Sequence, residues 1–162
     1  MKIDKEFIEV CRSLNEHGVR YVVCGGYAIK LHGVKDIAKQ ERKTVDYDFI
    51  LDPSRDNIEK IKKALKDINP KIKELRDDDL SRYSTVLIAS DTGRYLDIDL
   101  ISKIWDVDYE RASSGMIEKE IGGVKIPVVS IDCLLEMKKD SFRSRDITDT
   151  FWLRKIKERQ KR

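Results

Sequence analysis

The sequence predicts an α+β fold of mixed α/β character, in which a mixed β-sheet of about four to five strands is flanked by helices. Runs rich in β-branched and aromatic residues alternate with stretches whose apolar residues repeat at the helical period. Two of the strand-like runs are joined only by the turn-forming sequence "DTG", which favours an antiparallel pair. The chain has 162 residues, enough for one domain. We therefore expect residues 1–162 to form a single domain, with the C-terminal helices from about residue 130 packing on it.

The N-terminal part predicts a helix, a strand and a second helix. Residues 4–16 place their apolar side chains on one helical stripe, with Asp4 as N-cap and Gly18 ending the helix. The run "VRYVVC", residues 19–24, is compact and β-branched, as expected of a buried strand. It passes through a glycine pair directly into a short helix over 25–33.

The middle of the chain predicts a loop, a strand, a helix and a strand pair. Polar residues 37–43 indicate a loop, and 44–52 reads as the second strand. Residues 54–69 carry apolar residues on one face, with Ser54 as N-cap, which predicts an amphipathic helix covering one face of the sheet. The runs 84–90 and 94–102 are expected to form the antiparallel pair.

The C-terminal part predicts one more strand and two helices. Residues 124–130 indicate a short strand, and Ser130 or Asp132 caps the helix expected over 130–142. A last helix follows over 146–162. Its basic end either contacts RNA phosphates or is a solvated helix end.

The composition bounds the class of protein. Charged residues make up 39% of the chain but the net charge is only +3, so composition alone does not indicate a nucleic-acid binder. The abundance of Lys, Glu, Arg and Ile is typical of a thermophile. Cys11, Cys24 and Cys133 lack CxxC spacing, and the chain starts without an apolar segment, so we expect a soluble cytoplasmic protein without membrane contact. The two histidines, His17 and His32, have no partners at zinc-like spacing.

Two acids interrupt an apolar strand in "TVDYDFI", residues 44–50. Side chains alternate between the two faces of a strand, so Asp46 and Asp48 share one face, with their Cα atoms about 6.6 Å apart. Carboxylates that close repel each other unless cations lie between them. Oxygen ligands without His or Cys favour Mg²⁺ or Mn²⁺. The alternative is that both acids form the wet face of an amphipathic strand.

A second pair, Asp97 and Asp99, occurs in the later strand "YLDIDLIS". These two acids also share one face. If the two strands are neighbours, Asp97 or Asp99 completes an acidic trio of the kind that suits phosphoryl or nucleotidyl transfer.

Gly25 and Gly26 lie where a buried strand becomes a helix. Backbone N–H groups there can face an anionic ligand without a Cβ intervening, which predicts a phosphate cradle. A tight connection without a ligand is the alternative. The sequence contains neither a P-loop nor a Rossmann GxGxxG motif.

These motifs in succession, "GGYAIKLHG", "RKTVDYDFI" and "YLDIDLIS", resemble the minimal nucleotidyltransferases of the DNA polymerase beta superfamily. The resemblance is closest to the small prokaryotic group that includes the abortive-infection type II toxins, with their Arg-x-Thr-x-Asp-x-Asp motif. It covers about residues 15 to 155 and extends to a late helix with a characteristic spacing of charged residues. In this chain those residues are Lys138, Arg143, Arg145, Asp146 and Asp149.

The resemblance implies a nucleotidyltransferase fold and roles for individual residues. Gly25 and Gly26 would contact a nucleoside triphosphate, and Asp46 and Asp48 would bind the metal ions. The third carboxylate would be Asp99, because two aliphatic residues follow it, with Asp97 as the alternate.

Further residues are implied by the same resemblance. Lys138 would face the phosphates. Arg42 and Thr44 would order the loop before the metal-binding strand or contact the nucleotide. The remaining charges of the late helix fit either a functional role or a structural ion-pair cluster.

The main hypothesis is therefore a metal-dependent nucleotidyltransferase that uses Mg²⁺ or Mn²⁺ and an NTP such as ATP. It would transfer NMP to a hydroxyl group of an acceptor, which is RNA, a protein or a small molecule. The alternative is a non-catalytic or partner-dependent component of a toxin–antitoxin system that retains the fold and binds a cognate toxin or antitoxin. A metal-dependent nuclease is a third hypothesis, which the glycine pair disfavours, and a homodimer stays open.

Overall fold

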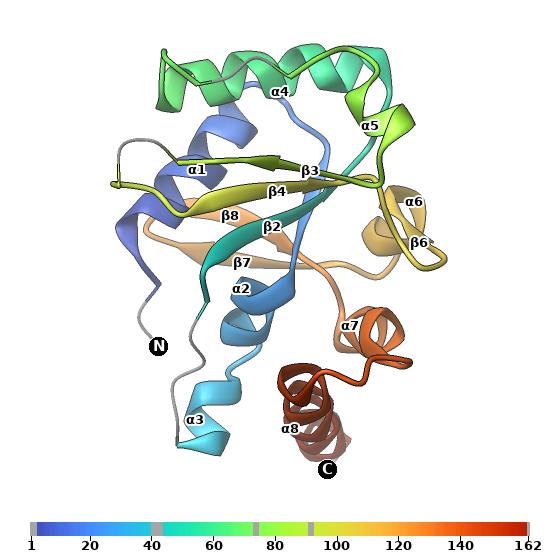
Figure 1. Cartoon of the computed structure of the whole chain (residues 1–162). Helices are drawn as coiled ribbons and strands as arrows, with labels where there is room; N and C mark the ends of the chain where they lie inside the picture. Colours follow the sequence, from blue (N-terminus) through green and yellow to red (C-terminus); the bar gives the residue numbers. More distant parts are fainter. Residues whose placement is uncertain (1–2, 40–43, 73–74, 91–92, 162) are drawn as a thin grey trace.

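The computed structural model describes residues 3–39, 44–72, 75–90 and 93–161, and its centre is a six-stranded β-sheet with helices on both sides (Figure 1). The sheet order is β3-β4-β2-β1-β8-β7, and β5 pairs with β6 in a separate two-stranded ladder. The strands are β1 (Tyr21–Cys24), β2 (Asp46–Leu51), β3 (Thr85–Ile88), β4 (Asp97–Ile101), β5 (Lys103–Ile104), β6 (Val107–Asp108), β7 (Ile117–Ile121) and β8 (Val124–Val128).

Helices occur between the strands along the first half of the chain, and two helices form its C-terminal end. They are α1 (Lys5–Glu16), α2 (Gly25–Leu31), α3 (Val34–Ala38), α4 (Arg55–Ile68), α5 (Asp79–Arg82), α6 (Tyr109–Ser113), α7 (Ile131–Lys138) and α8 (Ser144–Gln160). Within the described part of the chain, no helix has both the length and the apolar character needed to cross a membrane.

The sheet is mixed, as predicted. β2 runs antiparallel to β1 and parallel to β4, and β1 runs parallel to β8. The predicted antiparallel pair of β3 and β4 is confirmed, although residues 91–92 of its "DTG" turn lie outside the described residues. The central position of β1 explains why all four of its residues are buried.

The sheet has six strands, more than the four to five predicted, because β7 was missed. Its sequence, "IEKEI", carries three charged residues, and the strand lies at the edge of the sheet with most of its side chains exposed. Gly122 and Gly123 connect it to β8, both with positive φ, which suits the tight two-residue turn of this hairpin. An edge strand with little burial lacks the apolar alternation by which strands are recognised in sequence.

The expected loop over 37–43 is wrong at its start, because Ile37 and Ala38 belong to α3. Gly33, with φ +84, ends α2 and redirects the chain into α3, which the polar sequence did not indicate. Residues 40–43 lie outside the described residues. The short α5, α6 and β5–β6 elements were also not predicted.

Three predicted helix caps are confirmed. Asp4 Oδ1 accepts a hydrogen bond of 2.8 Å from a backbone N–H in the first turn of α1. Ser54 and Ser130 cap α4 and α7 in the same way, each accepting from a backbone N–H three residues later. Capping therefore fixes where these three helices begin, and one of them, α7, borders the site described below.

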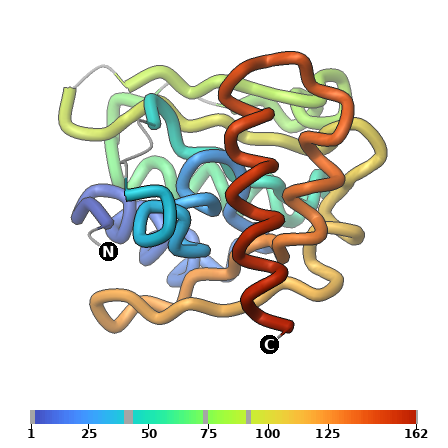
Figure 2. Tube along the Cα trace, turned by 90° about the horizontal axis from the view of Figure 1, so that it is seen from below, coloured from blue at the N-terminus to red at the C-terminus, as the bar shows by residue number. Residues whose placement is uncertain are grey.

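The two faces of β2 have different neighbours. Tyr47 and Phe49 point into an aromatic core cluster with Phe7 of α1 and Tyr27 of α2, with Phe7 and Tyr27 stacked at 4.2 Å. α1 also packs against α4 on this side of the sheet. On the opposite side lie α7 and α8, and Figure 2 shows α8 crossing this side beside α3. The aspartates of β2 therefore face the layer formed by the C-terminal helices.

Candidate active site

Three carboxylates meet on the C-terminal-helix side of the sheet. β2 and β4 pair in parallel with Asp46 opposite Asp97 and Asp48 opposite Asp99, so all four acids lie in two adjacent rows. Asp46, Asp48 and Asp99 each offer a carboxylate oxygen, and these oxygens all lie within 4.8 Å of one another. We call these three residues the acidic trio.

Asp97 lies beside the acidic trio rather than in it. Its Oδ1 accepts a hydrogen bond of 2.7 Å from the backbone N–H of Ser90, directly after β3. The carboxylate of Asp97 is thus occupied by a hydrogen bond to the neighbouring backbone, whereas the carboxylate of Asp99 lies close to those of Asp46 and Asp48.

Burial and mutual repulsion raise the pKa values of Asp46 and Asp99. Burial raises the pKa of Asp46 to about 6, and its hydrogen bond with Asp99 and the negative charge of Asp99 act in the same direction. Burial also raises the pKa of Asp99, as do its hydrogen bond with Asp48 and the charge of Asp48, while its hydrogen bond with Asp46 opposes the shift. Three close oxygen ligands whose charges repel one another fit a divalent cation, and the absence of sulfur and nitrogen ligands among them suits Mg²⁺ or Mn²⁺.

Gly25 makes room for Asp48. Gly25 has φ +63, and a Cβ at this position would lie 2.0 Å from Asp48 Oδ2 and 2.8 Å from Asp48 Cβ. Only glycine fits this conformation and this close approach without displacing the carboxylate. Gly26 follows as a buried residue in the first turn of α2. The glycine pair thus borders the acidic trio directly, and one of its functions is to accommodate Asp48.

A cavity of about 150 Å³ lies between Asp48 of the acidic trio and the C-terminal helices. Asp48 and Gly25 line it from the sheet side, and Lys138, Arg143 and Asp146 line it from α7 and the start of α8. Its apolar lining is Ile101, Ile104, Leu134 and Met137. The cavity therefore combines an acidic wall, a basic wall and an apolar wall.

The basic wall is held in place by buried ion pairs. Lys138 Nζ lies 2.6 Å from Asp146 Oδ1 and 3.2 Å from Asp149 Oδ2. Asp146 Oδ2 also accepts hydrogen bonds of 2.7 Å each from Ser141 Oγ and from Arg143 Nε. Burial alone would raise the pKa of Asp146, but these bonds outweigh it and hold the pKa well below the usual range.

The structure therefore brings together most of the residues that the sequence singled out. Lys138 lines the same cavity as Asp48 and Gly25, and its ion pairs join it to two aspartates of the late-helix motif. Arg145 lies close enough for its charge to lower the pKa of Asp46.

Two further residues implied by the resemblance are Arg42 and Thr44. Arg42 lies outside the described residues. The hydroxyl of Thr44, just before β2, is buried and has no hydrogen-bond partner among the described residues. The roles of both in nucleotide contact stay predictions.

The mixed sheet with its flanking helices corresponds to a nucleotidyltransferase fold. A solved structure of the lincosamide antibiotic adenylyltransferase LnuA, with lincomycin bound, is similar to this chain, with a TM-score of 0.66 and 18% sequence identity. The match covers 95% of this chain and 98% of that chain. No protein-family model and no curated protein matches the sequence. The likeness at this level of identity shows the fold.

Proposed function

We propose that this protein is a metal-dependent nucleotidyltransferase, which transfers NMP from an NTP to a hydroxyl group of an acceptor. The observation that supports the proposal is the acidic trio, one member of which, Asp48, lines a cavity whose other side carries Lys138 and Arg143. This pairing of acids and cations suits a triphosphate with its cations, and the fold is shared with a known adenylyltransferase.

Each wall of the cavity has a separate part in this proposal. Asp46, Asp48 and Asp99 would hold Mg²⁺ or Mn²⁺, which when bound would neutralise negative charge on the phosphates. Lys138 and Arg143 would attract the leaving phosphates, because Asp146 anchors both cations beside the cavity. The backbone at Gly25 and Gly26 would pass close to the triphosphate because neither residue carries a side chain.

The reaction replaces a phosphoanhydride bond of the NTP by a phosphoester bond to the acceptor. The acceptor oxygen attacks the α-phosphorus, the bond from this phosphorus to the bridging oxygen of the β-phosphate breaks, and pyrophosphate leaves. Asp99 accepts the proton of the acceptor hydroxyl and passes it to solvent.

The proposal also assigns this chain to the group that resembles the abortive-infection type II toxins. This assignment is supported by the Arg-x-Thr-x-Asp-x-Asp sequence and by the late-helix residues, of which Lys138, Asp146 and Asp149 form the buried ion pairs. A partner-dependent role without catalysis is the rival. The acidic trio favours catalysis, because a purely structural role would not require three repelling acids on one patch. A small protein encoded by a neighbouring gene that co-purifies with this chain would support the toxin–antitoxin assignment.

The proposed function is tested by transfer of label from α-³²P-labelled NTPs. The purified chain is incubated with Mg²⁺ or Mn²⁺ and with total RNA or total protein as acceptors. Label in macromolecules is expected for the wild type and is expected to fall to background for Asp46→Ala. Asp97→Asn is the matched control, because it removes a negative charge beside the trio while an amide oxygen can still accept from Ser90. Label transfer that survives in Asp46→Ala would overturn the proposal.

A further inference from the structure

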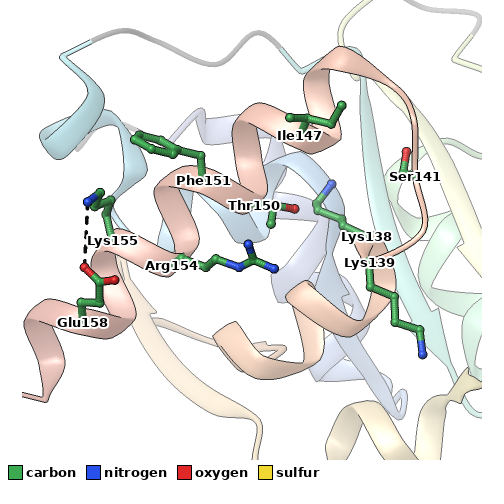
Figure 3. Close-up of a pocket in the computed structure, with 9 residues that line it drawn as sticks. All are labelled: Lys138, Lys139, Ser141, Ile147, Thr150, Phe151, Arg154, Lys155 and Glu158. Carbon is green, nitrogen blue, oxygen red and sulfur yellow. Dashed lines mark ion pairs between the residues drawn. The ribbon is translucent and has the colours of Figure 1, made fainter.

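A cavity of about 520 Å³ forms a groove along the C-terminal helices (Figure 3). Its walls are the end of α7, the turn after it and one face of α8. The lining residues are Lys138, Lys139, Ser141, Ile147, Thr150, Phe151, Arg154, Lys155 and Glu158. We call this the α7–α8 groove. The α8 residues recur at intervals of three and four, so they form one continuous helical stripe.

The α7–α8 groove is strongly basic. Four of its lining residues are cationic and one, Glu158, is acidic, whereas the whole chain has a net charge of only +3. Glu158 forms an ion pair with Lys155 at 4.0 Å, and Lys138 forms ion pairs with the buried Asp146 and Asp149. Among the described residues, Lys139 and Arg154 have no acidic partner within salt-bridge distance. Their charges are thus available to an anionic ligand.

The same groove exposes apolar side chains where a solvated helix would carry polar ones. Phe151 is 53% exposed and Ile147 is 58% exposed, one turn apart on α8. Lys155 lies over the ring of Phe151, 5.6 Å from its centroid. Figure 3 shows the side chains of Thr150 and Arg154 pointing from α8 toward the α7 side of the groove. Flat apolar surface thus alternates with cationic and hydroxyl groups along one stripe.

The α7–α8 groove adjoins the candidate active site. Lys138 lines both the groove and the cavity that contains Asp48. The ion pairs of Lys138 with Asp146 and Asp149 fix this shared wall. A ligand in the groove would therefore lie one side chain away from the cavity of the acidic trio.

We propose that the α7–α8 groove binds a nucleotide unit of the acceptor, with a phosphate at Arg154 and Thr150 and a base against Phe151. An exposed aromatic ring flanked by cations is the combination with which proteins bind unpaired nucleotides, because any base can stack and any phosphate can pair with Arg. The cationic lining disfavours a cationic small molecule by repulsion. The nucleotide unit comes from one of two sources, the end of an RNA strand or a free mononucleotide. The role of this ligand as acceptor rests on the proposed function, whereas its binding does not.

Binding is tested without any NTP, by fluorescence anisotropy of a labelled single-stranded oligoribonucleotide of about ten nucleotides. Arg154→Ala is compared with Arg159→Ala, which removes the same charge from an exposed position of α8 outside the groove. We expect Arg154→Ala to weaken binding about tenfold and to lower the slope of log K against log salt by about 0.7, with Arg159→Ala close to wild type. Phe151→Leu keeps the apolar bulk but loses the flat ring, and should also weaken binding about tenfold.

Competition with unlabelled AMP and UMP distinguishes the two sources. A mononucleotide that displaces the labelled strand from the wild type but not from Arg154→Ala supports a free nucleotide as ligand. Failure of mononucleotides to compete supports the end of a strand. Equal weakening by Arg154→Ala and Arg159→Ala, or no effect of Phe151→Leu, would overturn the groove proposal, provided that thermal unfolding shows all variants to be folded.

The label-transfer assay separates this proposal from the proposed function. If binding depends on Arg154 but the wild type transfers no label, the proposed function fails and the groove stands. If the wild type transfers label, and Arg154→Ala uses an oligoribonucleotide acceptor as well as Arg159→Ala does, the groove proposal fails and the proposed function stands.

Discussion

Substituting Gly25 by alanine tests the close contact between the glycine turn and the acidic trio. The new Cβ would lie 2.0 Å from Asp48 Oδ2, whereas ordinary contacts begin at 3.4 Å, so the carboxylate oxygen must retreat by about 1.4 Å. A rotation of the Asp48 side chain is not sufficient, because Asp48 Cβ itself would be only 2.8 Å away and is fixed to the backbone of β2. Either the start of α2 or the strand must move.

The expected costs follow from two separate effects. Alanine at a positive φ costs roughly 1 to 2 kcal/mol in conformational energy, partly offset by a stiffer unfolded chain. Overpacking in a tight site adds about 1 to 3 kcal/mol. Displacing a metal-binding carboxylate by more than an ångström should slow the transfer reaction about 100-fold.

Gly18→Ala is the matched control for Gly25→Ala. Gly18 also has a positive φ, +67, but a Cβ there would meet nothing within 4 Å. Urea unfolding should show a loss of about 1 kcal/mol for Gly18→Ala and of about 2 to 4 kcal/mol for Gly25→Ala. Label transfer should be unchanged in Gly18→Ala and reduced in Gly25→Ala. Equal stability and equal activity of the two variants would refute the close contact.

Three further predictions concern other parts of the structure. Asp99→Asn should slow label transfer by a factor of about 100 to 10,000, with Asp97→Asn close to wild type, and the opposite order would show that Asp97 is the third carboxylate. Asn57 is fully buried and makes three hydrogen bonds with backbone groups before β1 and after β2, so Asn57→Ala should lower the free energy of unfolding by about 3 kcal/mol in urea without changing NTP binding. Asp146→Asn removes a buried partner of Lys138 and should cost about 3 kcal/mol at pH 7. The lowered pKa of Asp146 contributes stability that is complete above its unfolded value of about 3.9 and is lost progressively as the pH falls toward its folded value, so the difference between wild type and variant in urea unfolding should be smaller at pH 3 than at pH 7. A constant difference from pH 7 to pH 3 would contradict this account of Asp146.

The local periodicity of the sequence was sufficient to assign each aspartate to a face of its strand. It was not sufficient to decide whether Asp97 or Asp99 is the third carboxylate of the site. Alternation along a strand puts Asp46 and Asp48 on one face whatever the rest of the fold. It does the same for Asp97 and Asp99, so the sequence pattern alone could not rank them. The register of β4 against β2, together with the hydrogen bond from Ser90 to Asp97, separates them in space. Such pairing depends on segments far apart in the chain, which no local pattern encodes.

Contacts between segments far apart in the chain also reveal structural roles for residues that the sequence analysis had selected for other reasons. Gly25 was predicted to leave room for a phosphate, and the structure shows a second reason for glycine, the carboxylate of Asp48. The spacing from Lys138 to Asp149 was noticed, but only the turn between α7 and α8 brings their side chains together. The α7–α8 groove was not predicted, because it forms only where the end of α7, the turn after it and one face of α8 come together.

The central claim is that the acidic trio is a metal centre, and Mn²⁺ binding tests it most directly. Electron paramagnetic resonance measures free Mn²⁺ during titration of the protein, with and without a non-hydrolysable ATP analogue. The account predicts specific binding by the wild type that the analogue strengthens, that Asp48→Asn abolishes, and that Asp97→Asn leaves intact. Equal binding by the wild type and Asp48→Asn would contradict it.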